Sequence, residues 1–355
     1  MWPNDQIREL FGIELPIVQA PMAGFTTPEM VVAVSEAGGL GSLPCALLDA
    51  NQLRAELETV RRGTRRPINV NFFCHAVPAA DGERERAWRE RLATYYVELG
   101  LDPKVPVPGS TRTSFDEAMC DVVVDFRPEV MSFHFGLPDR KLVARVKAAG
   151  MKVISSATTV EEAIWLEDAG CDAIIAQGYE AGGHRGMFLT REVWSQVGTM
   201  ALVPQVVDAV KVPVIAAGGI GDARGIVAAF ALGASAVQLG TAYLFCAEAR
   251  LNPFHRQALT RVRETGTALT NVFTGRPARA IVNRAVREVG PISEVAPEFP
   301  LAAGAIGPLR SKAEAAGVDD FTPMWSGQAA GLCHWLTAGE LTRRLAAEAL
   351  AKVRR

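Results

Sequence analysis

A helix end, a glycine turn and a buried strand follow one another in Asp168-Ala169-Gly170-Cys171-Asp172-Ala173-Ile174-Ile175-Ala176. The same order returns around three other glycines, Gly38, Gly150 and Gly233. Each glycine stands where the end of a helix favours a left-handed residue, a conformation that a side chain disfavours. The strands that follow are continuous apolar runs, which is typical of parallel strands covered by helices on both faces. The repeated pattern predicts an α/β fold around a parallel sheet.

Four more apolar runs, at residues 17–20, 68–71, 130–133 and 214–217, bring the predicted strands to eight. Eight alternating strand and helix units indicate a (β/α)8 TIM barrel with right-handed crossovers. A doubly wound open sheet is the alternative fold. It requires a dinucleotide-binding fingerprint after the first strand, and Ala20-Pro21-Met22-Ala23-Gly24 is not one.

Two stretches interrupt the barrel pattern. Residues 75–110 follow the third strand and residues 251–323 follow the eighth, so both leave the barrel at the carboxyl ends of its strands, where barrel enzymes keep their sites. We therefore predict a barrel formed by residues 1–74, 111–250 and 324–355. The inserted residues 75–110 and 251–323 form a smaller, mostly helical cap or substrate domain in this prediction.

Composition and charge limit the classes of function that this chain can have. The chain has 355 residues, and its 37 basic and 39 acidic side chains leave a net charge of −2, so nothing favours nucleic acid or an anionic membrane as a partner. Its six cysteines form no C-x-x-C pair, which indicates reduced thiols, a cytoplasmic location and no metal site. The N-terminus shows no signal peptide. The uncharged stretch 225–247 is interpreted as a buried helix and strand, not as a membrane span, because glycines and polar residues interrupt it.

Two glycine turns follow neighbouring strands. One lies in Val214-Ile215-Ala216-Ala217-Gly218-Gly219-Ile220-Gly221-Asp222 and the other in Val237-Gln238-Leu239-Gly240-Thr241. Glycines allow the backbone to approach a ligand closely, so that free N–H groups can meet phosphate oxygens. Barrels often bind phosphate at the loops after the seventh and eighth strands. The pair of turns predicts a phosphate site, with tight structural turns as the alternative.

Polar residues at other strand ends suggest what is attached to that phosphate. Asn71 and Gln177 carry amides that donate and accept hydrogen bonds, as the edge of a flavin ring requires, and Met22 offers a soft thioether for a ring to lie against. The reactive candidate is His184, which stands between glycines after the sixth strand and can exchange a proton near neutral pH. His134 follows the fourth strand and is predicted to face substrate. For each of these residues a purely structural role is the alternative.

These phrases resemble the nitronate monooxygenase family of FMN-dependent TIM barrels, formerly called 2-nitropropane dioxygenases. The resemblance extends from residue 16 to 331 and includes residues 16–24, Asn69-Val70-Asn71, residues 132–138, 177–186 and Trp325-Ser326-Gly327-Gln328. It implies FMN as cofactor and oxidation of alkyl nitronates, such as propionate 3-nitronate, with O2 to a carbonyl product and nitrite. It implies His184 as the active-site histidine. Our predicted FMN contacts are Met22, Asn71, Gln177, Gly182, Gly183, Gly218, Gly219, Gln238, Leu239, Gly240 and Thr241.

Other functions remain open on the same scaffold. They are an NAD(P)H:quinone reductase, a flavin-dependent enoyl reductase and a non-enzymatic sensor of FMN or phosphate. A titratable His184 argues against the sensor. Arg276, Arg279, Arg284 and Lys312 in the cap are candidates to pair with a substrate carboxylate or a nicotinamide phosphate, with a solvated helix face as the alternative for each. With His134 we select Lys312 as substrate-binding. We expect a small-molecule substrate and a monomer or homodimer.

Overall fold

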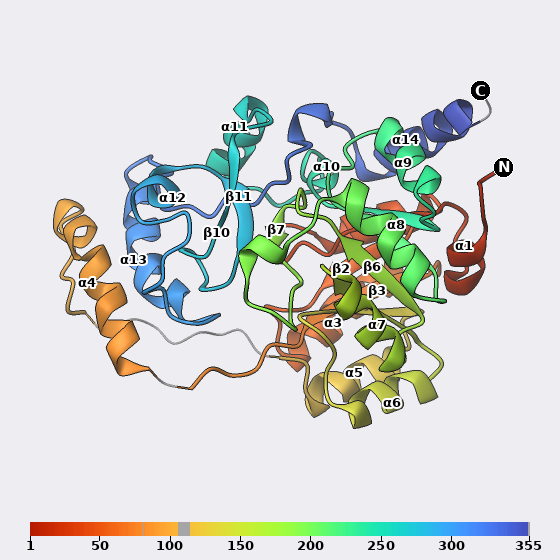
Figure 1. The fold of residues 1–355 in the computed structure, drawn as a ribbon, viewed down its shortest axis with the longest axis horizontal. Helices are drawn as coiled ribbons and strands as arrows, with labels where there is room; N and C mark the ends of the chain where they lie inside the picture. The colour runs from red at the N-terminus through yellow and green to blue at the C-terminus, as the bar shows by residue number, and fades with distance from the viewer. Residues whose placement is uncertain (80, 106–113, 354–355) are drawn as a thin grey trace.

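The computed structural model describes residues 1–79, 81–105 and 114–353. Figure 1 shows two parts side by side along the long axis, a barrel that carries both ends of the chain and a smaller unit of helices and short strands. The predicted domain boundary near residues 110 and 111 lies outside the described residues.

All eight predicted barrel strands are present and parallel. Their order around the sheet is β1-β9-β8-β6-β5-β4-β3-β2. A parallel bridge between Val18 and Leu40 joins the two outer strands, so the sheet closes on itself. The prediction of a TIM barrel is confirmed. The strands are β1 (Ile17–Gln19), β2 (Gly41–Pro44), β3 (Ile68–Phe73), β4 (Val130–His134), β5 (Lys152–Ala157), β6 (Ala173–Gln177), β8 (Val214–Ala217) and β9 (Ala236–Leu239).

Eight helices surround these strands: α2 (Pro28–Glu36), α3 (Ala50–Gly63), α5 (Glu117–Phe126), α6 (Arg140–Ala148), α7 (Val160–Asp168), α8 (Thr199–Ala209), α9 (Ala223–Ala231) and α14 (Ala338–Val353). Seven of them begin after a Thr or Asp whose side chain accepts a hydrogen bond from a backbone N–H of the first turn, which ends the preceding loop at a defined residue. The short helix α1 (Gln6–Phe11) packs Ile7 and Phe11 against the barrel interior. The amino end of the barrel is therefore filled, and its carboxyl end is left for a site.

The smaller unit has its own apolar core, whose buried residues come from 88–96 and 272–321. Trp88 of α4 donates from its ring N–H to the carbonyl of Ala302 at 3.1 Å, and the Tyr96 hydroxyl donates to the carbonyl of Ala305 at 2.6 Å. Figure 1 shows α4 beside α13, although about two hundred residues separate them in the chain. The elements are α4 (Gly82–Glu98), α11 (Pro253–Arg261), β10 (Thr267–Thr270), β11 (Ala278–Ile281), α12 (Arg284–Glu288) and α13 (Ala302–Ala315).

The smaller unit also contains a three-stranded antiparallel sheet, which the sequence did not predict. Its order is β10-β11-β7. Its edge strand β7 (Gly183–His184) comes from the loop after β6 of the barrel, and His184 pairs with Ala278 of β11. This loop therefore links the two parts through backbone hydrogen bonding. Shorter elements complete the chain: α10 (Thr241–Leu244) and the 3-10 turns Val193–Ser195 and Ala330–Leu332.

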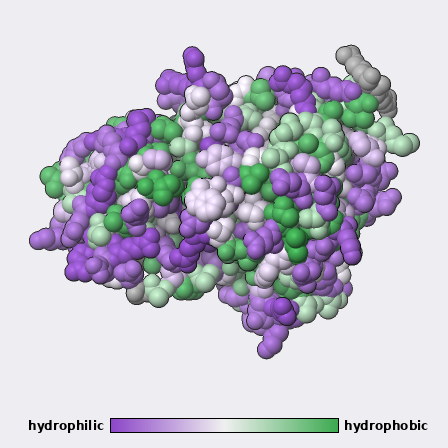
Figure 2. Space-filling view, viewed as in Figure 1, coloured by the Kyte–Doolittle hydropathy of each residue, from purple (hydrophilic) through white to green (hydrophobic). Residues whose placement is uncertain are grey.

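The surface is mostly polar. Figure 2 shows hydrophilic residues over much of one face, with apolar groups scattered between them. Within the described ranges, no helix is both long enough and apolar enough to cross a membrane.

Candidate active site

A cleft opens at the carboxyl ends of the barrel strands, beside the smaller unit. It measures about 1310 Å³ with its open mouth included. Most predicted site residues line it: Met22, Asn71, His134, Gln177, Gly182, Gly183, His184, Gly218, Gly219, Gln238, Gly240 and Thr241. Two predicted residues do not. Leu239 is packed into the core between strands and helices, and Lys312 lies on the exposed face of α13.

The two glycine turns form one wall of the cleft. Gly218 and Gly219 have φ angles of +103° and +70°, which side chains rarely adopt. A Cβ atom on Gly218 would lie 3.0 Å from the carbonyl oxygen of Gly178. At Gly240, by contrast, a Cβ atom would touch only Ala20 and Met22 of the cleft wall, at 3.6 and 4.0 Å. The backbone at Gly240 is therefore open to a ligand in the cleft, as a phosphate cradle requires, whereas Gly218 is a glycine because the Gly178 loop packs closely against it.

Three amide side chains from barrel strands line the cleft, and they differ in what they bind. Asn71 donates to the hydroxyl and carbonyl oxygens of Ser132, at 2.9 and 3.2 Å. Gln177 donates to the carbonyl of His184 at 3.0 Å and accepts from the N–H of Gly186 at 2.7 Å. Gln238 is different, because its buried carbonyl oxygen has no hydrogen-bond partner among the described residues. A buried acceptor without a partner is costly, so this atom fits a ligand that brings an N–H donor, such as a flavin ring.

His184 lines the cleft where the barrel meets the smaller unit, at the pairing of β7 with β11. Its Nε2 atom is 3.0 Å from the hydroxyl oxygen of Thr274. Four aromatic rings surround the imidazole: Phe299 and Trp325 at 5.3 Å between ring centroids, Phe73 at 5.9 Å and Phe135 at 6.0 Å. These rings limit the movement of the imidazole and shield this end of the cleft from water.

His134 has a defined tautomer. Its Nε2 atom is 3.1 Å from the carbonyl oxygen of His184, which can only accept, so Nε2 carries the hydrogen. Its Nδ1 atom then accepts from the Ser156 hydroxyl at 3.1 Å. Burial, together with the charges of Arg276 and Arg185, lowers the pKa of His134 to about 4. His134 is therefore neutral at physiological pH, and with Gln177 it holds the backbone of His184.

Two buried arginines hold the His184 loop: Arg185, which the sequence analysis did not assign to the site, and Arg279, which it proposed as a partner for a substrate group. Arg185 is fully buried and donates to the carbonyls of Gln177 and Gly178, both at 2.6 Å. Arg279 donates to the carbonyl of Tyr179 and lies over its ring at 4.6 Å. Burial, followed by the charge of Arg279, lowers the pKa of Arg185 to about 9. An arginine directly after His184 and between glycines is the only sequence signal that could have identified this role.

None of the four proposed carboxylate partners lines the cleft. Arg279 holds the loop, and Arg276 lies over Phe135 at 3.9 Å and donates to the carbonyl of Met187. Arg284 pairs with Glu98 and Glu288, and Lys312 is exposed.

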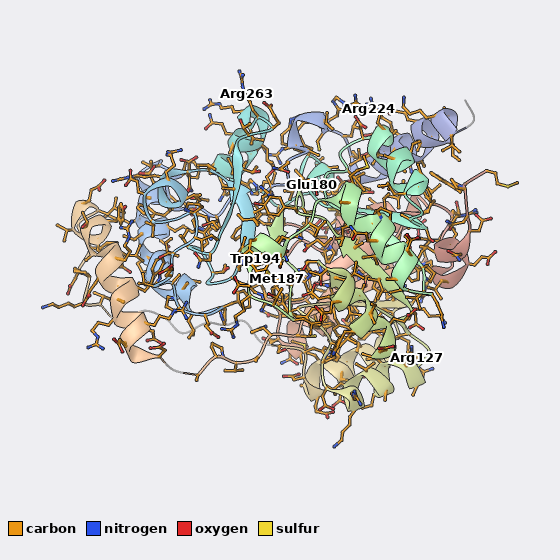
Figure 3. All side chains as sticks on the ribbon, in the orientation of Figure 1. Arg127, Glu180, Met187, Trp194, Arg224 and Arg263 are labelled. Carbon is orange, nitrogen blue, oxygen red and sulfur yellow. The ribbon has the colours of Figure 1, made fainter. Side chains whose placement is uncertain are left out.

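Glu180 carries the only formal side-chain charge among the described lining residues, and its carboxylate accepts from the N–H and hydroxyl of Thr199. Figure 3 shows Glu180 near the middle of the molecule, with Arg127, Arg224 and Arg263 at the periphery.

Comparisons with known proteins agree on one family. Residues 4–348 match the family model described as nitronate monooxygenase. The chain is 44% identical to a nitronate monooxygenase from Pseudomonas aeruginosa, over 97% of this chain and 99% of the relative. A nitronate monooxygenase from Paraburkholderia phytofirmans is 41% identical, over 96% of this chain and 93% of the relative.

Two solved structures extend this likeness to three dimensions. The structure of a nitroalkane oxidase from Streptomyces ansochromogenes superposes with a TM-score of 0.88 at 40% identity, over 98% of this chain and 99% of that one. FabK from Thermotoga maritima superposes with a TM-score of 0.74 at 29% identity, over 98% and 96% of the two chains.

Proposed function

The chain belongs to the nitronate monooxygenase family, a flavin-dependent family of oxidoreductases, and we propose that it oxidises alkyl nitronates with O2 to a carbonyl product and nitrite. FMN is the proposed flavin. The observation that carries the proposal is the cleft itself, in which a phosphate cradle and an unpartnered amide acceptor face a histidine enclosed by aromatic rings. No pyridine nucleotide is needed in this proposal, because the substrate is the reductant.

The residues on the barrel side fit FMN. The backbone at Gly218, Gly219 and Gly240, together with the hydroxyl of Thr241, would hold the phosphate. The carbonyl oxygen of Gln238 would accept from a ring N–H, and the Met22 thioether would lie against the ring. The chemistry that bound FMN supplies is electron transfer from the nitronate and onward to oxygen.

The residues on the other side act on the substrate. A neutral His184 imidazole would remove a proton from the carbon beside the nitro group of a nitroalkane. The imidazolium that results would then lie beside the nitronate anion and stabilise its negative charge. The surrounding rings exclude water, which strengthens this interaction. Gln177 and His134 hold the carbonyl of His184 and thereby keep the loop in place.

Three measurements on the purified protein test this function. Heating should release a yellow cofactor that chromatography identifies as FMN. An alkyl nitronate in air should yield nitrite. Under anaerobic conditions the nitronate, but neither NADH nor NADPH, should bleach the flavin rapidly. Rapid bleaching by NADH or NADPH would favour a quinone or enoyl reductase, and a protein that neither holds nor takes up FMN would reject the proposal.

A further inference from the structure

The candidate base His184 is held by the smaller unit as well as by the barrel. Its strand β7 pairs with β11, and the backbone N–H of Arg185 donates to the carbonyl of Pro277 at 2.9 Å. At the side-chain level, the partner of its Nε2 atom is Thr274, in the turn between β10 and β11. Thr274 is 3% exposed and does not line the cleft.

We infer that Thr274 is a positioning residue, which sets the ring orientation and tautomer of His184. The inference rests on the proposed role of His184. At 3.0 Å the Thr274 hydroxyl is within hydrogen-bond distance of Nε2. In its second contact the Thr274 hydroxyl donates to the carbonyl of Arg276 at 3.5 Å, so its oxygen accepts from Nε2 and favours the tautomer that carries its hydrogen on Nε2. Nδ1 is then the proton acceptor of the ring, and the protonated imidazole keeps the same hydrogen bond from Nε2.

The turn that carries Thr274 is rigid. The side chain of Asn271 donates to the carbonyl of Ser293 at 2.9 Å and accepts from its N–H at 2.8 Å. The carbonyl of Asn271 accepts from the N–H groups of Thr274 and Gly275. Gly275 has a φ of +91°, and a Cβ atom there would lie 2.1 Å from the carbonyl oxygen of Pro297, so the turn has no room for a side chain. The Thr274 hydroxyl is therefore held in position before any substrate binds.

The inference has a matched set of variants. Thr274→Val keeps the shape and removes the hydroxyl, and Thr274→Ser keeps the hydroxyl. Thr270→Val is the control, because Thr270 is equally buried, lies on the preceding strand β10, and accepts only from the N–H of Val272 among the bonds described. A merely structural role would lower the stability of Thr274→Val and Thr270→Val alike and leave the histidine ring unaffected.

The primary readout is independent of catalysis. We label the protein with ¹⁵N-histidine, assign the His184 signals by their loss in His184→Asn, and measure the chemical shifts of both ring nitrogens. Only Thr274→Val should change the balance between the Nδ1–H and Nε2–H tautomers; Thr274→Ser and Thr270→Val should match the wild type. Unchanged shifts in Thr274→Val overturn the inference, whatever the activity.

The second readout is the rate on a neutral nitroalkane. Thr274→Val should lower kcat about tenfold, the equivalent of one lost hydrogen bond, with KM nearly unchanged and a shifted pH profile. Thr274→Ser should recover most of the rate. Wild-type kcat and pH profile in Thr274→Val would contradict the inference. If the ¹⁵N shifts change but His184→Asn is itself fully active, the positioning stands and the proposed role of His184 fails.

Discussion

The two sides of the cleft are constructed differently. On the barrel side, glycine turns and amides such as Gln238 stand at strand ends, where the backbone is close to the ligand. On the other side, Thr274 and Phe299 of the smaller unit and Trp325 behind it surround His184. Because of this difference, we expect cofactor binding and substrate chemistry to be lost through different substitutions. A substitution on the barrel side should prevent flavin binding. A substitution on the other side should leave the flavin bound and slow the proton transfer.

The largest effect is expected on the barrel side. Gly240→Leu should leave the fold intact, because φ at Gly240 is −105° and the nearest atoms to a Cβ are 3.6 Å away, but the longer side chain enters the cleft. We expect FMN affinity to fall at least a thousandfold, about 4 kcal/mol, and activity to vanish. Absorbance of the purified protein measures this. Gly82→Leu is the control, because a Cβ at the exposed Gly82 meets no atom within 4 Å. Full FMN content in Gly240→Leu would show that this turn does not hold the phosphate.

The second-largest effect is expected at His184. His184→Asn should lower the rate on a neutral nitroalkane by roughly 10²–10⁴-fold, the usual contribution of a general base. The loss should be smaller on the preformed nitronate, where no proton need be removed. FMN content should stay at the wild-type level. Nitrite release from both substrate forms measures the two losses, and equal, small losses would make His184 a structural residue of its loop.

Two buried histidines, one in each part, predict how stability responds to acid. Burial is the main cause that lowers the pKa of both His134 and His255 to about 4. The unfolded chain takes up these protons near pH 6.5, so stability is lost as pH falls from 6.5 to 4, by about 3 kcal/mol for each histidine. Urea unfolding at several pH values between 7 and 4.5 measures the slope of the free energy of unfolding against pH. His255→Gln should reduce this slope by one proton; an unchanged slope in this variant would contradict the assignment.

The smallest effect concerns the charge of the substrate. Lys312 is exposed, and the described lining residues include no Lys or Arg, so a substrate carboxylate would lack a cationic partner in the cleft. We expect kcat/KM for propionate 3-nitronate to be about tenfold below that for an uncharged alkyl nitronate of similar length. Lys312→Ala should change neither value. If Lys312→Ala lowered kcat/KM for the carboxylated substrate alone, Lys312 would be assigned to substrate binding after all.

Most residues that line the cleft could be named from the sequence because their positions depend on the barrel. Met22, Asn71, Gln177, Gly218 and Gln238 all stand near or just after a strand end, and a parallel barrel brings every such position to one rim. Lys312 was selected for its charge alone, and nothing in a helical sequence pattern states which face of α13 meets the cleft. Thr274 had no local signal, because its role depends on a contact with His184, which is ninety residues away in the chain.

The sequence by itself determined the barrel, because each strand, its glycine turn and its helix are specified by short-range patterns that repeat along the chain. Only the tertiary structure decided how His184 is held. The pairing of β7 with β11 joins residues that are about a hundred positions apart, and two residues of strand are too few to produce a periodic signal. That pairing requires the barrel and the smaller unit to be packed against each other. The aromatic rings and the threonine hydroxyl around His184 therefore come together through packing between the two parts, which no single stretch of sequence encodes.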